Sequence, residues 1–339
     1  MKKMLNSLYI STQGSYLHKE RETLIVEADG KKLGQFPMHA IENIFCFGQI
    51  MVSPALMGAC GEKGINLSFM TEFGKFLARV QGPQSGNVLL RRQQYRIADQ
   101  DPVSIARLMI AAKIANSRQV LLRHQRNHGE DDNLATVCHR LSHLLKQAER
   151  ETNLDRLRGI EGDGAQNYFS VFSSLIRSNP DHDFKLEGRN KRPPTDPVNA
   201  MLSFAYTLLT HEIASALQSV GLDPYVGFMH RDRPGRLSLA LDMIEEFRSP
   251  WCDRFVLSLI NRKQLGAKDF KQDAAGGVKL SEDARKQFLV AWQERKQVVI
   301  THPYLDEKIP TGLIPYVQST LLGRHIRGDI EVYPPFLVR

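Results

Sequence analysis

The spacing of the apolar residues changes once along this chain of 339 residues, and that change constrains the fold most strongly. Before residue 81, apolar residues form short β-branched or aromatic runs separated by turn signals, which is typical of strands. After residue 87 they recur at helical spacing over long segments. The stretch Gln81–Asn87 between them is rich in Gly and polar residues, as linkers are. We therefore expect an α+β protein with two domains, residues 1–86 and 87–339.

The first domain is expected to be a small β-sandwich with one inserted helix. The pair Asp29–Gly30 stands between two strand-like runs and is a strong hairpin signal. A short helix is predicted from Ser53 to Lys63, because Ser53 can cap it and Pro54 suits its first turn. Strands are expected at residues 7–12, 23–27, 41–47, 65–70 and 76–80.

The second domain is expected to be all helical, because its apolar residues follow the period of amphipathic helices. Helices are predicted at residues 103–126, 133–150, 153–176, 197–218, 237–248, 253–262, 282–295 and 312–327. The polar stretch 178–195 contains several prolines and is expected to be a loop.

Charge and cysteine content narrow the class of protein. The chain carries 45 Lys and Arg against 37 Asp and Glu, a net charge of +8 that favours a polyanionic partner. No apolar run is long enough for a membrane span, and no apolar segment follows the lysines at the start. The four cysteines are widely spaced without a CxxC pair, so we expect inert thiols in a reducing cytoplasm.

Three acidic residues in the predicted helix 237–248 are the first candidates for chemistry. On an ideal helix Asp242, Glu245 and Glu246 fall within one arc of about 100°. Most such arcs are merely solvated acidic faces. However, Gly227–His230 ends one loop earlier, and the loop between carries Arg231 and Arg233. A histidine with two carboxylates suits Mg²⁺ or Mn²⁺, and neighbouring arginines suit phosphate.

Two further segments add to this candidate site. Glu161 lies in a helix-like stretch between Gly159, Gly162 and Gly164, where so many glycines need a reason. The reason is either close approach of another chain or a helix that breaks or starts here. The second segment is a basic loop, 189–192, followed by Asp196 as the cap of a helix whose positive end suits phosphate.

Four motifs in order carry a resemblance to a known family. They are the glycine-flanked Glu161, the run RNKRPPTDPVNAMLSFAY at 189–206, GFMH at 227–230 and SLALDMIEEFR at 238–248. Together they resemble the CRISPR-associated adaptation integrase, the metal-dependent DNA endonuclease common to CRISPR systems. The opening NSLYISTQGSYL at 6–17 resembles its type I-C branch. The likeness covers essentially the whole chain.

The resemblance implies a function and a set of residues. It implies a homodimer that joins a small ferredoxin-like partner and inserts short foreign DNA fragments into the CRISPR array. It places the metal ligands at Glu161 and His230, with Asp242 or Glu245 as the third; we prefer Glu245 and expect Asp242 to orient the site. The residues expected to contact DNA are Arg189, Arg192, Arg231, Arg233 and Asn199, although Asn199 could equally be structural.

The expected chemistry is metal-assisted attack on a phosphodiester bond by a 3′-hydroxyl or by water. Two alternatives remain open from the sequence. One is a junction-resolving repair nuclease that uses the same metal site without integration. The other is a non-catalytic DNA-binding scaffold whose acidic residues are structural.

Overall fold

The computed structural model describes residues 7–41, 43–72, 76–80, 82, 88–177, 184–186, 188–190, 193–274 and 276–338. Internal contacts divide the chain into two compact units. The first contains residues 1–86 together with the later segments 285–300 and 308–315. The second contains residues 87–284, 301–307 and 316–339. The first domain was predicted to contain residues 1–86 alone, so the prediction missed its two later segments.

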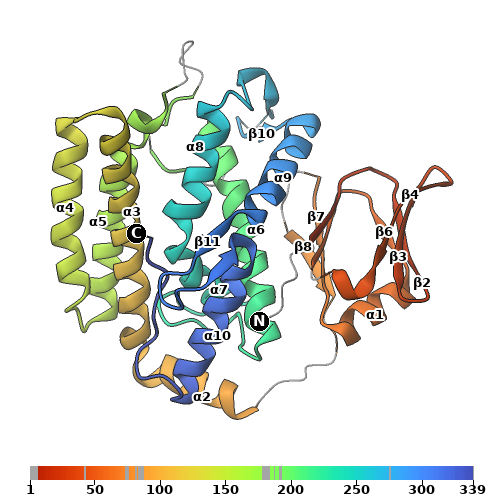
Figure 1. The fold of residues 1–339 in the computed structure, drawn as a ribbon, viewed down its shortest axis with the longest axis horizontal. Helices are drawn as coiled ribbons and strands as arrows, with labels where there is room; N and C mark the ends of the chain where they lie inside the picture. Colours follow the sequence, from red (N-terminus) through yellow and green to blue (C-terminus); the bar gives the residue numbers. More distant parts are fainter. Residues whose placement is uncertain are drawn as a thin grey trace. The chain divides into compact units, whose positions relative to one another are not determined.

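Two four-stranded sheets form the strand-rich part of the first unit (Figure 1). The first sheet has the order β1 (Ser7–Ile10), β5 (Asn43–Phe47), β7 (Asn66–Met70) and β8 (Phe76–Val80). The second has the order β4 (Lys31–Pro37), β3 (Thr23–Ala28), β2 (Tyr16–Glu20) and β6 (Met51–Val52). Buried residues from both sheets form one core, to which Leu56 and Cys60 of α1 (Pro54–Lys63) contribute. This arrangement is a sandwich built on a shared core.

Local sequence signals explain the turns of this unit. Strands β3 and β4 pair antiparallel with Ala28 opposite Lys31, so Asp29 and Gly30 form the predicted two-residue turn. Both residues have positive φ, as such hairpin turns require. Ser53 accepts a hydrogen bond from the Leu56 amide and thereby caps α1, as predicted.

The second unit consists mainly of helices. They are α2 (Val88–Gln100), α3 (Pro102–His128), α4 (Asp132–Ala148), α5 (Leu154–Ser170), α6 (Pro197–Ser219), α7 (Ser238–Met243), α8 (Arg254–Asn261) and most of α10 (Ile314–Arg327). Helices α3, α4 and α5 pack side by side (Figure 1). Helix α9 (Glu282–Gln297) starts in this unit and continues in the first.

The expectation of an all-helical second domain is wrong in one respect. Strands β9 (Phe270–Gln272) and β10 (Val278–Leu280) form an antiparallel ribbon within this unit. A second ribbon pairs β11 (Val299–Thr301) with β12 (Lys308–Pro310). Strands of three residues carry too little periodicity to be distinguished from loops. Helix α2 was also not predicted.

The predicted helix at 237–248 is also wrong beyond its first turns. Helix α7 ends at Met243 and is followed by a 3₁₀ turn, η3 (Ile244–Glu246), and then by a π-helical turn, η4 (Arg248–Asp253). Both irregular turns change the direction of successive side chains away from 100° per residue. Such turns often occur at functional sites.

All four cysteines are buried and free of disulfides, as expected. Burial raises the pKa of the Cys46 thiol to about 12 and that of Cys60 to about 11. These thiols therefore stay protonated and unreactive near neutral pH. Among the described residues, no helix has the length and apolar character needed to cross a membrane.

Candidate metal centre

The loop 227–230 is folded around the carboxylate of Asp242, which is fully buried. Asp242 Oδ2 accepts hydrogen bonds from the amides of Phe228 (2.6 Å) and Met229 (2.9 Å). Its Oδ1 accepts one from the His230 amide (3.0 Å) and lies 2.5 Å from His230 Nδ1. A carboxylate offers about four acceptor sites. All of them are engaged, so Asp242 is suited to position His230.

Two consequences follow for His230. The carboxylate of Asp242 can only accept, so Nδ1 of His230 carries a proton, and in the neutral ring Nε2 keeps its lone pair. In the part of the chain that the structure describes, no residue hydrogen-bonds to Nε2. The loop needs Gly227, because a Cβ there would lie 2.5 Å from Asp242 Oδ2 and 2.8 Å from the Ser238 carbonyl carbon. The orientation of the His230 ring is thus fixed from behind by Asp242.

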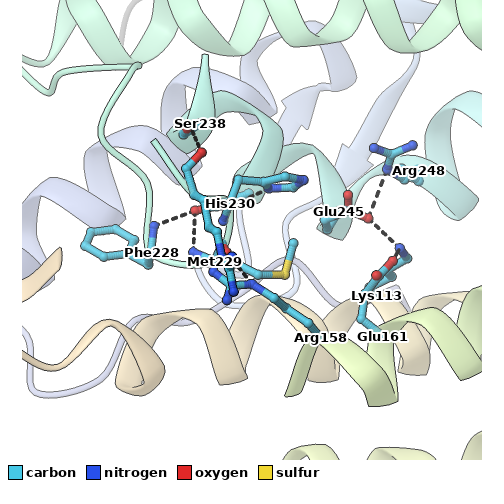
Figure 2. A network of polar contacts seen from close by, with 11 residues as sticks. Lys113, Arg158, Glu161, Phe228, Met229, His230, Ser238, Glu245 and Arg248 are labelled. Atoms are coloured by element: carbon cyan, nitrogen blue, oxygen red, sulfur yellow. Dashed lines mark hydrogen bonds and ion pairs between the residues drawn. The ribbon is translucent and has the colours of Figure 1, made fainter. Parts of the chain in front are cut away.

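Glu161 and Glu245 meet at the ammonium group of Lys113 (Figure 2). Lys113 comes from α3, Glu161 from α5 and Glu245 from η3. Lys113 Nζ donates a hydrogen bond to Glu161 Oε1 and lies 2.7 Å from Glu245 Oε2. Arg248 Nε forms a second ion pair with the same Glu245 oxygen at 2.9 Å. Two carboxylates from distant parts of the sequence are therefore held around one cation.

The charges of this cluster are strongly coupled. The Glu245 side chain is only 3% exposed, and burial alone would raise its pKa. The positive charges of Arg248 and Lys113, with a smaller effect of His230, outweigh burial and bring that pKa to about 2. Burial lowers the pKa of Arg248, but Glu245 and the smaller effects of Tyr206, Asp253 and Glu161 together raise it above its ordinary value. Glu245 is therefore ionised at any ordinary pH, and His230 is close enough for its charge to act on Glu245.

Glu246 points away from this cluster, so the predicted common acidic arc is wrong. It is fully buried and accepts hydrogen bonds from the Tyr333 hydroxyl (2.7 Å), the Phe336 amide (2.7 Å) and Gln318 Nε2 (3.2 Å). Burial raises its pKa to about 7, against the lowering effect of these donors. Glu246 anchors the C-terminal segment, and none of the three acids forms a solvated face, since all are buried.

The glycines around Glu161 divide into two kinds. Helix α5 runs without a break through all three, so the expected break or start of a helix is wrong. A Cβ at Gly164 would lie 3.3 Å from the Ile114 side chain, which explains that glycine by close packing of α5 on α3. No atom lies within 4 Å of a Cβ built at Gly159 or Gly162. These two leave open space along α5 on either side of Glu161.

The basic loop before α6 is organised by Asn199 and Arg189. Asn199 is fully buried, donates to the Gly188 carbonyl and to Asp196, and accepts from Arg189. Its contacts are structural, which was one of the two expectations. Arg189 lies over the Tyr206 ring, 5.3 Å from its centroid, and Arg248 lies 4.5 Å from the same centroid. Arg192 lies outside the described residues.

The two arginines expected after His230 are exposed. Arg231 is 73% exposed and approaches Asp155 at 3.3 Å. Arg233 is exposed as well. Asp155 also pairs with Arg158, whose Nε donates to the Met229 carbonyl at 2.9 Å. Arg158 therefore ties the start of α5 to the loop that carries His230.

Sequence reasoning missed Lys113 and Arg248, which complete the cluster. The available signal for Lys113 was its place in the apolar run 109–115 of a helix, where an unpaired lysine is rarely buried. Arg248 was visible as the residue three after Glu245, a spacing that favours an ion pair within a helical turn. Neither signal identifies the partner across the fold.

No group of three or more His, Cys, Asp and Glu that could hold a metal is assembled among the described residues. The donor set nevertheless suits a hard divalent cation, because it offers two carboxylates and one imidazole nitrogen. Glu245 Oε2 is buried and is held by the cationic groups of Lys113 and Arg248. The point where the two carboxylates converge therefore attracts positive charge, which Lys113 supplies.

Comparisons with known proteins agree on one family. The model of the family "CRISPR associated protein Cas1" matches residues 8–294. The chain is 50% identical to the CRISPR-associated endonuclease Cas1 2 of Rhodospirillum rubrum, over 99% of both chains. A CAS1 protein structure from Thermotoga maritima has the same fold (TM-score 0.81, 24% identity, 97% of this chain and 99% of that one). So has a casposase bound to an integration product (TM-score 0.82, 22% identity, 96% and 92%).

Proposed function

This chain belongs to the Cas1 family of CRISPR-associated proteins, and from that premise we propose that it is a divalent-metal-dependent DNA endonuclease and integrase. Its proposed role is to insert short foreign DNA fragments into the CRISPR array, in adaptive antiviral defence. The observation that carries the proposal is the convergence of Glu161 and Glu245 on one cation beside the open nitrogen of His230. The relatives' name, endonuclease, supports the cleavage half of it.

Glu161, Glu245 and Nε2 of His230 would hold Mg²⁺ or Mn²⁺. We prefer Glu245 to Asp242 as the third ligand, because the four acceptor sites of Asp242 are already engaged by the loop 228–230. A divalent cation bound there supplies Lewis-acid stabilisation of the charge that develops on the phosphate. Asp242 keeps the correct histidine tautomer, as carboxylates behind metal-bound histidines do.

Lys113 and Arg248 have two tasks in this proposal. They keep Glu245 ionised, which a ligand requires. They also leave positive charge beside the reacting phosphate, where hydrogen-bond donors stabilise the transition state. In the integration step a 3′-hydroxyl oxygen attacks the phosphorus of the target strand. A new phosphodiester forms and the bond to the target strand's own 3′-oxygen breaks.

The DNA would approach along α5 and the surrounding basic residues. Gly159 and Gly162 leave open space beside Glu161 for a backbone to come close. The exposed Arg231 and Arg233 are proposed phosphate contacts at the rim, with Arg189 and Arg192 on the loop before α6. Asn199 would act indirectly, by holding Arg189 in place.

We further propose the assembly that the sequence resemblance implies. The protein would act in the cytoplasm as a homodimer of the type I-C branch, together with a small ferredoxin-like partner protein. The bound DNA would be a duplex fragment and the CRISPR repeat.

Strand transfer into supercoiled plasmid DNA tests the proposal. A labelled short duplex with free 3′-hydroxyls is incubated with the protein, its partner and Mn²⁺. We expect labelled plasmid with the wild type, a drop of about 10³-fold with Glu161→Gln, and no change with the control Glu130→Gln, which alters an exposed carboxylate of the same unit. The casposase solved with an integration product is the reason to measure joining as well as cleavage.

Two outcomes would replace the proposal. Cleavage without joining, even with the partner present, would identify a junction-resolving nuclease. DNA binding with neither reaction, and equal behaviour of Glu161→Gln and Glu130→Gln, would identify a non-catalytic scaffold.

A further inference from the structure

A second polar cavity lies in the helical unit, where the end of α3 faces α8. Its volume is about 230 Å³. Helix α3 contributes Arg123, His124, Asn127 and His128 to its lining, and α8 contributes Arg254 and Ser258. Both helices are labelled in Figure 1. We call this cavity the arginine pocket.

The arginine pocket gathers positive charge without a balancing carboxylate. Burial lowers the pKa of the half-buried Arg254, and the charge of Arg123 lowers it further. Within the described ranges, neither arginine forms an ion pair with an acidic residue. A third guanidinium, that of Arg177, lies 2.7 Å from His128 Nδ1. Neighbouring positive groups are stabilised when an anion enters between them.

The two histidines add hydrogen-bond donors to the arginine pocket. The guanidinium of Arg177 can only donate, so His128 Nδ1 accepts and its Nε2 carries a proton. Burial, His128 and Arg177 lower the pKa of His124, and only Asp131 acts in the other direction. Asp131 Oδ1 is engaged by the amides of Asn133 and Leu134, since it caps α4. The lining is therefore rich in donors and poor in acceptors.

A phosphate group fits this chemistry. Guanidinium groups bind phosphate through paired N–H donors, which gives both strength and orientation. Ten residues of unbroken α3 separate Lys113 of the metal centre from Arg123 of the pocket. At the rise of an α-helix that is about 15 Å. A B-form strand advances about 3.4 Å per nucleotide along the duplex axis, so a strand running along α3 would span this separation in a few nucleotides.

We propose that the arginine pocket binds a backbone phosphate of a DNA strand, a few nucleotides from the phosphodiester at the candidate metal centre. The choice of DNA as the ligand rests on the proposed function, whereas the location of the site rests on the residues that line the pocket. The contact reads no sequence and sets the register of the strand, as phosphate contacts do.

Salt-dependent DNA binding by the full-length protein tests the assignment without divalent metal. Fluorescence anisotropy with a labelled 30-nucleotide duplex is recorded over a range of NaCl concentrations. Arg254→Gln should weaken binding about 5-fold or more, and Arg123→Gln, which changes an exposed arginine, should weaken it less. Each should reduce the slope of log K against log salt by about 0.7–0.9. Arg126→Gln is the matched control for Arg123→Gln, because Arg126 is also exposed on α3 but does not line the pocket.

A charge-conserving variant guards against misfolding. Arg254→Lys should keep most of the salt slope while losing part of the affinity, since a lysine cannot form the paired contact. Equal slopes for Arg254→Gln and Arg126→Gln, with both proteins folded, would overturn the assignment. A second result would also overturn it: Arg254→Gln binds inorganic phosphate or a mononucleotide more weakly than the wild type but binds DNA equally well. That result would identify a site for small anions. Loss of slope in a protein inactive in strand transfer would retain the pocket and reject the proposed function.

Discussion

Two clusters of charge in the helical unit are balanced in opposite ways. In the metal centre, each buried carboxylate has a cation: Glu161 pairs with Lys113, and Glu245 pairs with Lys113 and Arg248. In the arginine pocket, Arg123 and Arg254 face each other, and the described residues offer them no acidic partner. One cluster balances its charge within the protein, and the other lacks anions.

This difference indicates what each cluster can bind. A centre whose charges are already balanced accepts a divalent cation only if the ammonium group of Lys113 moves away or loses its proton. A pocket of unbalanced guanidinium groups gains from any phosphate that enters. Under the proposed function both clusters would serve one substrate, because DNA at the candidate metal centre would bring the reacting phosphate and its neighbours along the same strand.

The largest effect is expected from removing the ammonium group of Lys113, which lies between the two carboxylates of the candidate metal centre. Lys113→Met leaves Glu161 without its partner and Glu245 with one cation, which should cost about 3–5 kcal/mol of unfolding free energy. Saturating Mn²⁺ should restore much of this, because it replaces the lost charge and binds only the folded state. Urea unfolding with and without Mn²⁺ measures both quantities.

The control for this variant is Lys146→Met, which removes an exposed lysine from α4. It should lose little stability and respond to Mn²⁺ as the wild type does. An equal loss for Lys113→Met with and without Mn²⁺ would show that Lys113 and the metal do not share a position.

The next effect separates Asp242 from Glu245 within the metal centre. Asp242→Asn turns an N–H donor toward amides that were hydrogen-bonded to a carboxylate, and should cost about 3 kcal/mol. Thermal or urea unfolding without metal measures it. Glu245→Gln should cost about as much, because it leaves the buried Lys113 and Arg248 short of a carboxylate. The two variants should differ in their response to Mn²⁺: saturating Mn²⁺ should still stabilise Asp242→Asn but not Glu245→Gln. The reverse response would contradict the assigned roles.

The sequence alone predicted the features that neighbouring residues determine, and it failed for those that depend on distant residues. The Asp29–Gly30 turn and the Ser53 cap were predicted because neighbouring residues determine them. The acidic arc failed because a 3₁₀ turn replaces the helix at Ile244, and Glu246 in that turn accepts a hydrogen bond from the distant Phe336 amide. Periodicity cannot show such a change.

The candidate site shows the same limit. Glu161, His230, Asp242 and Glu245 could be named from motifs, but the motifs did not distinguish their roles. The roles became distinct only when Asp242 was seen beneath three amides of the histidine loop. Lys113 lies 48 residues before Glu161, and no local pattern joins the two. The arginine pocket combines α3 with α8 and is equally non-local.

A pH effect on stability is expected at Asp253. Asp253 precedes Arg254 and accepts a hydrogen bond of 2.5 Å from the Tyr206 hydroxyl. Burial raises its pKa from 3.8 to about 6, against the lowering effects of Tyr206 and Arg248. The folded state therefore keeps this proton longer than the unfolded chain, so stability should fall as pH rises from about 4 to about 6. The size of this fall is about 2 kcal/mol.

Asp253→Asn removes this titration while keeping an acceptor for Tyr206. The difference in unfolding free energy between pH 4 and pH 7 should therefore shrink by about 2 kcal/mol relative to wild type. Urea titrations at the two pH values check it. An unchanged pH dependence would show that Asp253 is ionised throughout.

The smallest effect is expected at the exposed arginines. Arg231→Gln and Arg233→Gln should weaken DNA binding by no more than about 3-fold, because exposed charges interact weakly through water. Their thermal stability should match that of the wild type. A larger loss than that of Arg254→Gln in the same anisotropy assay would reverse the ranking of rim and pocket.

Binding of Mn²⁺ without DNA tests the central claim most directly. Electron paramagnetic resonance of free Mn²⁺ gives the affinity of the wild type, Glu245→Gln and Asp242→Asn. The account predicts one site in the wild type, a loss of more than 100-fold for Glu245→Gln, and a loss of about 10-fold for Asp242→Asn, which acts through His230. Abolished binding in Asp242→Asn with wild-type affinity in Glu245→Gln would contradict it.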